Sequence, residues 1–175
     1  MKVFGNIKDF AYIKRDDSRT VICYGLEPDG DNATWHEVVI YKKQVMNPSL
    51  EQIRQAIVDD INNRVSERIL TGFVWNGQAV WLSKESQKNI SDLYMIAQQT
   101  DGANLPVTLK LNEDENGKSV FHTFYKTNEL LDFYKGASGF IIDCLNDGWN
   151  EKDSIDYGVY EKALGPKKGV DPKSV

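Results

Sequence analysis

The stretch of sequence that decides the fold is residues 49–82, SLEQIRQAIVDDINNRVSERILTGFVWNGQAVWL. Ser49 is a residue type that caps helix N-termini, and Gln52 completes a capping box with it. Apolar side chains then recur at intervals of three or four residues, which is the period of one helix face. They are Leu50, Ile53, Ile57, Ile61, Val65 and Ile69. Together these signals predict a long helix with one apolar face.

The spacing within this apolar stripe favours a globular environment. One interval of three residues is followed by four intervals of four, and each interval of four rotates the stripe by about 40° around the helix. A coiled-coil seam alternates threes and fours, which keeps it facing one partner. We therefore expect the helix to pack on a globular core rather than in a fibre. A bundled oligomer remains an alternative.

The helix pattern ends at an Asn-Gly pair, Asn76-Gly77, between two apolar runs. This pair predicts a two-residue hairpin turn, because both residues of such a turn need positive φ. The resulting register pairs Trp75 with Gln78, Phe73 with Val80 and Thr71 with Leu82. The face that carries these pairs is the better core candidate, and the opposite face holds Gly72, Val74, Ala79 and Trp81.

Further elements lie on both sides of this stretch. We expect strands at residues 20–24 and 35–41, a helix from Ser83 to about residue 100, strands at 105–111 and 119–125, and a helix over residues 127–145. Helices segregated from hairpins predict an α+β fold, a small antiparallel sheet of hairpins packed against about three helices.

Three regions follow from this arrangement. Residues 1–46 are predicted to be a β-rich N-terminal segment, and residues 47–150 an α+β core domain. Residues 151–175 are predicted to be a partly flexible C-terminal extension, with a loose tail from residue 165.

Composition excludes several classes of protein. The 175 residues include 26 acidic and 21 basic ones, a net charge of -5, which argues against a nucleic-acid-binding surface. The sequence has no apolar run long enough to span a membrane and no signal-peptide segment. Cys23 and Cys144 both lie in apolar runs, so buried reduced thiols are expected, although a disulfide stays open. This favours a reducing cytoplasm, or a particle assembled there.

The sequence shows no motif of a catalytic or metal site. His36 and His122 each stand alone in a strand-like run without a second ligand at zinc spacing, so structural roles are favoured. Nucleophile elbows and phosphate-binding loops are absent. Asp143 and Asp147, one helical turn apart, are better explained as a solvated face than as paired catalytic carboxylates. Residues 112–115 lack the calcium-loop spacing and are better explained as a hairpin tip. We therefore predict no catalytic residue, cofactor or metal.

Tryptophans are the remaining candidates for an interaction site. The chain has four, and an exposed indole can stack on a sugar or bind a protein partner. Each is also a reasonable core residue. Trp35, Trp75 and Trp149 are the candidates for interaction, with Trp75 placed beside the hairpin tip.

Residues from about 35 to 147 resemble an uncharacterised domain family of bacteriophage tail, tail-fibre-associated and prophage proteins. Members resembling this chain share a helix followed by a GF-x-W-x-G-x-x-V-W-L hairpin, here Gly72 to Leu82. A helix of Ser/Asp-x-x-x-Gln type follows, here Ser83 to Asn89, and a P-V-x-x-K strand comes later, here Pro106 to Lys110. The resemblance carries no catalytic residue.

What the resemblance implies is a phage context. We expect a non-enzymatic virion structural or accessory protein, associated with the tail or a fibre, in the virion or in the host cytoplasm during assembly. Its partners would be other phage structural proteins, with a homo-oligomer left open and no nucleic acid or membrane involved. Residues 1–34 and the chain after Gly148 lie outside the resemblance and are the expected docking elements. The alternative is a carbohydrate-binding module that uses exposed tryptophans to bind a glycan.

Overall fold

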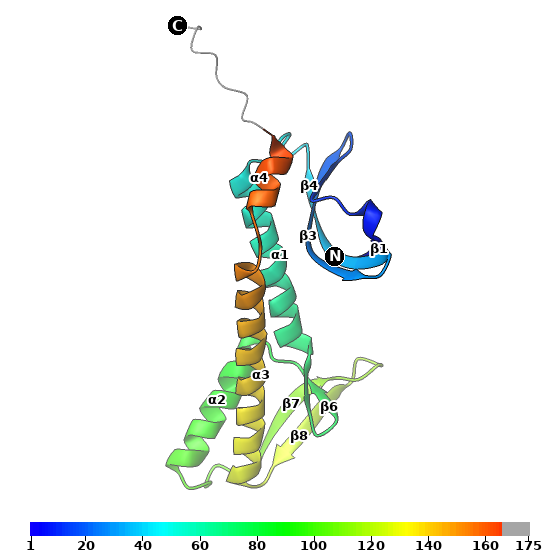
Figure 1. Cartoon of the computed structure of the whole chain (residues 1–175). Coiled ribbons are helices and arrows are strands. Elements are labelled where there is room, and N and C mark those ends of the chain that lie inside the picture. Colours follow the sequence, from blue (N-terminus) through cyan, green and yellow to red (C-terminus); the bar gives the residue numbers. More distant parts are fainter. Residues whose placement is uncertain (166–175) are drawn as a thin grey trace, which may run out of the picture. The chain divides into compact units, whose positions relative to one another are not determined.

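The computed structural model describes residues 1–165 (Figure 1). Helices combine with small antiparallel sheets, which confirms the predicted α+β class. The chain forms two compact units. Within the described chain, the sheet unit comprises Met1–Ile61 and residues 151–165, and the hairpin unit comprises Asn62–Asn150. The predicted core domain, residues 47–150, ends with the hairpin unit but begins earlier, because the limit between the units falls inside helix α1 (Leu50–Thr71).

The sheet unit is built on four antiparallel strands in the order β1-β4-β3-β2. They are β1 (Lys2–Asn6), β2 (Ile13–Arg15), β3 (Arg19–Asp29) and β4 (Asn32–Tyr41), and a short 3-10 helix, η1 (Ile7–Asp9), follows β1. The two predicted N-terminal strands do pair as a hairpin, with Ile22 opposite Val38. They run further than expected, because a register shift after Tyr24 lets pairing continue to a tight turn at Gly30, whose φ is +60°.

The first half of strand β3 is buried on both faces, which explains its uninterrupted apolar run. Residues 20–24 are all buried. On one face, a cluster forms from Val21, Cys23, Ala33 and Trp35. The N-terminal segment, which was predicted to be β-rich and separate from the core domain, therefore has a buried core cluster of its own.

Two helices of the sheet unit bond to β3. Tyr24 donates from its hydroxyl to a carboxylate oxygen of Asp60 on α1 at 2.6 Å. Tyr160, on α4 (Gly158–Leu164), donates to the backbone oxygen of Cys23 at 2.8 Å. The first half of α1 contributes three side chains with no exposed area: Ile53, Ile57 and Ile61. Helix α4 was not predicted. Residues 166–175, most of the expected loose tail, lie outside the described part of the chain.

Helix α1 begins as predicted. Ser49 accepts from the backbone N–H of Gln52 at 3.2 Å, and Gln52 accepts from that of Ser49 at 2.9 Å, which is the reciprocal capping box. Further along, Ile69 packs against the core of the hairpin unit. The drifting stripe thus supplies side chains to two globular cores, which agrees with the expected non-fibrous packing.

The hairpin unit contains two hairpins and two helices. The predicted turn is present in the first hairpin, β5 (Phe73–Trp75) and β6 (Gln78–Val80), where Asn76 and Gly77 have φ of +50° and +77°. Phe73 pairs with Val80 and Trp75 with Gln78, as expected. The pairing stops there, since the Leu82 N–H donates to the Leu70 oxygen at 3.0 Å instead of pairing with Thr71.

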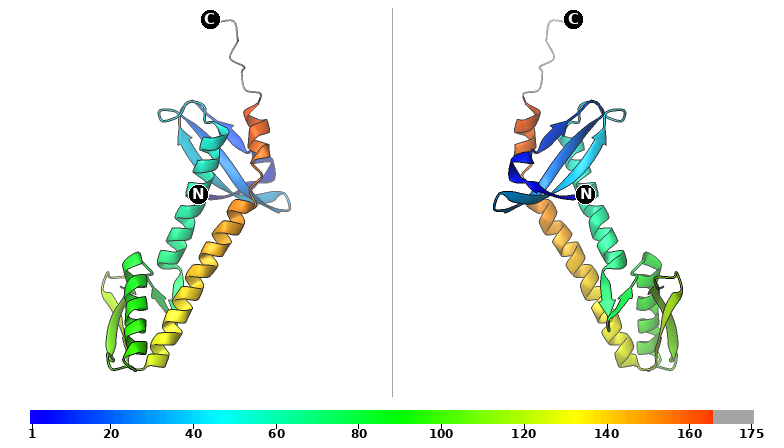
Figure 2. Two further views of the ribbon diagram at one scale, coloured as in Figure 1. Left: turned by 90° about the vertical axis from the view of Figure 1, so that its left-hand side faces the viewer. Right: turned by 90° about the vertical axis from the view of Figure 1, so that its right-hand side faces the viewer.

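The second hairpin is β7 (Val107–Glu113) with β8 (Ser119–Phe124). One backbone bond, from Trp81 N–H to the Leu111 oxygen at 2.8 Å, joins the two hairpins side by side. Helices α2 (Lys84–Gln99) and α3 (Thr127–Asp153) cover one side of the hairpins (Figure 2). Ser83 caps α2 as predicted, accepting from the Ser86 N–H. The core between the layers consists of Phe73, Val80, Leu82, Ile90, Ala97, Leu111, Phe124, Leu130, Phe133 and Ala137.

Candidate functional site

The tryptophans occupy contrasting environments. Trp35 is only 2% exposed, so it presents no ring face to a partner. Trp75 is half-buried, with its ring edge-on to Phe133 at a centroid distance of 5.0 Å. Trp149 is 55% exposed and Trp81 is 41% exposed. Of the three candidates singled out from the sequence, Trp149 is the one whose side chain faces solvent, and Trp81 joins it.

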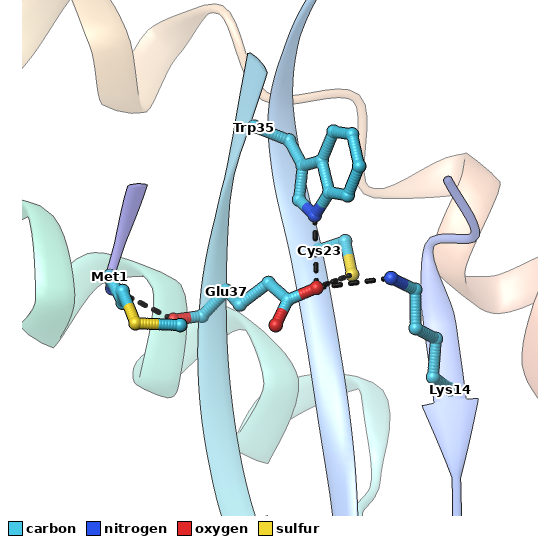
Figure 3. A network of polar contacts seen from close by, with 5 residues as sticks. All are labelled: Met1, Lys14, Cys23, Trp35 and Glu37. Atoms are coloured by element: carbon cyan, nitrogen blue, oxygen red, sulfur yellow. Dashed lines mark hydrogen bonds and ion pairs between the residues drawn. The ribbon is translucent and has the colours of Figure 1, made fainter. Parts of the chain in front are cut away.

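A polar network explains why Trp35 can be buried. Figure 3 shows three donors converging on one carboxylate oxygen of Glu37. The Trp35 indole N–H donates to it at 2.9 Å, the Lys14 ammonium at 3.0 Å and the Cys23 thiol at 3.7 Å. Burial alone would raise the pKa of Glu37, but the bonds from Trp35 and Lys14 hold that pKa below its usual value. We infer that this network holds strands β2, β3 and β4 together.

Neither cysteine is suited to nucleophilic chemistry. Both are free thiols with no exposed area, as the sequence indicated. Burial raises the pKa of Cys23 to about 11, although Lys14 opposes the rise. Burial also raises the pKa of Cys144. Since the thiolate is the reactive form, these side chains remain packing groups at neutral pH.

His122 has an acidic partner. Its Nε2 lies 2.8 Å from a carboxylate oxygen of Glu129, in the first turn of α3, and both side chains are about one-third exposed. The imidazole also packs edge-on against Trp75 at 4.9 Å. This contact links strand β8 to helix α3, which follows it after a short loop. His36 stacks on the buried Tyr24 ring at 5.3 Å.

The acidic candidates do not converge. Asp147 bonds Arg68 at 2.7 Å, and both side chains are more than half exposed. Asp143 is exposed as well. Within residues 1–165, no group of three or more His, Cys, Asp or Glu side chains is placed to hold a metal ion.

An exposed apolar strip runs along α3, which we call the α3 strip. Ile142 and Trp149 are each 55% exposed, and seven residues place them two helical turns apart on one face. Leu145 lies between them, half-buried. Exposed aromatic side chains of this size are a feature of protein-interaction surfaces.

The hairpin unit also contains a cavity of about 370 Å³ between strands β6 and β7 and the first turns of α2. Apolar residues and polar ones both contribute to its lining, among them Trp81, Asn89 and Asn112. Asn112 is only 7% exposed, and its amide oxygen has no hydrogen-bond partner. His122 does not line this cavity.

The sequence did not mark Asn112 as a site. Its assignment to a hairpin tip was wrong, because Asn112 lies inside strand β7, paired with Val120, and is buried. For Trp81 the sequence did contain a signal. The alternation of side chains along the first hairpin placed Trp81 on the face opposite Phe73 and Val80, which is the face that is exposed.

A comparison of the chain with known protein families, curated proteins and solved structures finds no match. The resemblance to phage tail-associated proteins therefore stays a prediction from the motifs of residues 35–147. None of the helices in the described chain is long and apolar enough to cross a membrane.

Proposed function

We propose that the chain is a non-enzymatic structural or accessory protein of a phage virion, associated with the tail or a fibre, that acts through contacts with other phage structural proteins. The motif resemblance supports the phage context. The observation that carries the mode of action is the α3 strip.

The chemistry of the α3 strip suits a protein partner. Tryptophan is enriched among the interface residues that contribute most to binding, since its large apolar surface is removed from water on association. Around Trp149 and Ile142, the exposed residues Asp143, Asn146 and Asn150 are polar. An apolar centre with a polar rim is the usual anatomy of a protein interface.

A test of the context is quantitative mass spectrometry of purified particles and assembly intermediates from cells that carry the gene. The proposal expects the chain in one of these fractions at a fixed ratio to a structural protein. Absence from both fractions refutes it.

A test of the mode of action compares incorporation of Trp149→Ala with that of Met95→Ala. Met95 is similarly exposed, but it lies on α2 and outside the strip. We expect at least tenfold less Trp149→Ala in particles at equal expression, since an interface tryptophan contributes about 2 kcal/mol or more. Equal incorporation of the two variants contradicts the role of the strip. Sedimentation of both variants would show whether the partner is a second copy of this chain.

Carbohydrate binding, the alternative function, has support from one of the tryptophans. Trp35 offers nothing to a glycan because it is buried, whereas Trp81 is exposed beside the cavity of the hairpin unit.

A further inference from the structure

We propose that the cavity of the hairpin unit is a binding site for a neutral saccharide. In this site, the Asn112 amide oxygen accepts a hydrogen bond from a sugar hydroxyl, and the Trp81 indole covers apolar sugar surface. The site is separate from the α3 strip and does not depend on the proposed structural role.

The unpartnered amide oxygen of Asn112 is the first observation that points to a ligand. A buried acceptor without a donor is costly, and native proteins rarely keep one without a use or a bound molecule to satisfy it. The missing group must be a donor such as a hydroxyl or an N–H. Carboxylates and fully ionised phosphates have no such donor, so they cannot satisfy the amide oxygen.

A β-bulge places Asn112 at the cavity. Leu109 pairs with His122 and Lys110 with Phe121, but the next pair is Asn112 with Val120. The extra residue, Leu111, shifts the alternation by one. Paired residues share a face, so Asn112 lies on the same face as Leu109 rather than on the solvent face of Lys110. Bulges commonly redirect a side chain in this way next to functional sites.

The remaining lining agrees with a ligand that is half polar and half apolar. Leu109, Leu111 and Phe133 provide apolar wall, while Asn89 and Ser83 bring polar groups. A pyranose has apolar C–H surface and hydroxyls on its rim, which match an indole and an amide respectively.

Charge favours a neutral ligand. The charged lining residues are Glu85 and Lys110, one of each sign, and Lys110 is paired with Glu113 at 2.6 Å. The cavity volume of about 370 Å³ is within the usual range for small-ligand sites.

The test is a titration of the full-length protein, labelled with ¹⁵N, with glucose, galactose, mannose, N-acetylglucosamine and their common disaccharides. We expect at least one saccharide to shift the Trp81 indole and Asn112 side-chain resonances. Trp81→Ala and Asn112→Ala should each weaken that binding about tenfold or more, the effect of losing one good contact. Met95→Ala, at an exposed position that does not line the cavity, should leave the affinity unchanged.

Three results overturn the proposal. The first is that no saccharide in the panel shifts these resonances. The second is that inorganic phosphate shifts them as strongly as any sugar, which would indicate an anion site. The third is that none of the three variants Asn89→Ala, Trp81→Ala and Asn112→Ala binds the saccharide more weakly than the wild type does. The exposed position of Asn89 makes its variant the one least able to disturb folding, so the comparison holds even where another variant fails to fold.

Discussion

Glu37→Ala should destabilise the sheet unit well beyond the effect of an ordinary surface charge change. The substitution leaves the Trp35 indole N–H, in a side chain 2% exposed, without its acceptor at 2.9 Å. An orphaned buried donor costs about 1–3 kcal/mol, and bonds to charged groups are at the upper end of the range. Lys14, about one-third exposed, can turn to water and adds little. We expect a loss of about 2–3 kcal/mol.

Thermal and urea unfolding followed by circular dichroism would measure this loss. For a chain of this size, about 2–3 kcal/mol corresponds to a fall in Tm of roughly 4–12 °C. The matched control is Glu27→Ala. Glu27 accepts from Lys2 at 2.9 Å and Thr34 at 2.8 Å on the same sheet, but its side chain is 68% exposed. Exposed ion pairs contribute about 0–1 kcal/mol. Equal losses in the two variants would refute the role assigned to the Glu37 network.

The pH dependence gives this prediction a second, independent readout. Because the folded protein holds the pKa of Glu37 below its usual value, the carboxylate form is favoured by folding. The stability it contributes is complete above the ordinary glutamate pKa of about 4.3, and it is lost as the pH falls through the lower folded pKa. Glu37→Gln keeps an acceptor for Trp35 but removes the charge. We expect it to reduce the acid-induced loss of stability below about pH 4.3, and an unchanged acid profile would contradict a lowered pKa of Glu37 in the folded protein.

Three further predictions concern single residues. Gly5→Ala should lower the free energy of unfolding by about 1–3 kcal/mol, because a Cβ there would lie 2.8 Å from the Trp35 ring and would overpack the site. An unchanged urea midpoint would contradict this prediction. Cys23, with its pKa raised to about 11, should react with a thiol reagent at pH 8 far more slowly in the folded than in the urea-unfolded protein, and equal rates would show that it is accessible. Asn112→Leu should leave the Tm unchanged or raise it, because it removes a buried amide oxygen that has no partner, whereas a large fall in Tm would show that this oxygen is satisfied.

The parts of the fold that the sequence predicted depend on local signals. The capping box at Ser49 and the turn at Asn76-Gly77 are each encoded within a few residues, and both are present. Helix α4 was missed because it is only seven residues long, and the contact that holds it, Tyr160 to Cys23, joins residues 137 positions apart. Strand β1 was missed for the same reason, since it pairs with β4 rather than with the strand next to it in sequence. Strand β2 pairs with the adjacent β3, but it has only three residues.

The candidate site shows the same limit. Trp35 and Trp81 are both large aromatic residues in strand-like runs, and their burial differs because of distant residues. Trp35 is covered because the bare backbone of Gly5 approaches its ring on the neighbouring strand. Asn112 reaches the cavity only because of a bulge, and the strand pattern of residues 105–111 contained no sign of it.

The central claim is that the α3 strip binds another phage structural protein. The most direct test places a photo-crosslinking amino acid at position 149 in the protein, and at position 95 as the control, in cells that are assembling particles. We predict a crosslink from position 149 to a structural protein of the particle and none from position 95. Failure of position 149 to crosslink to any particle protein, or the same products from both positions, would contradict the claim.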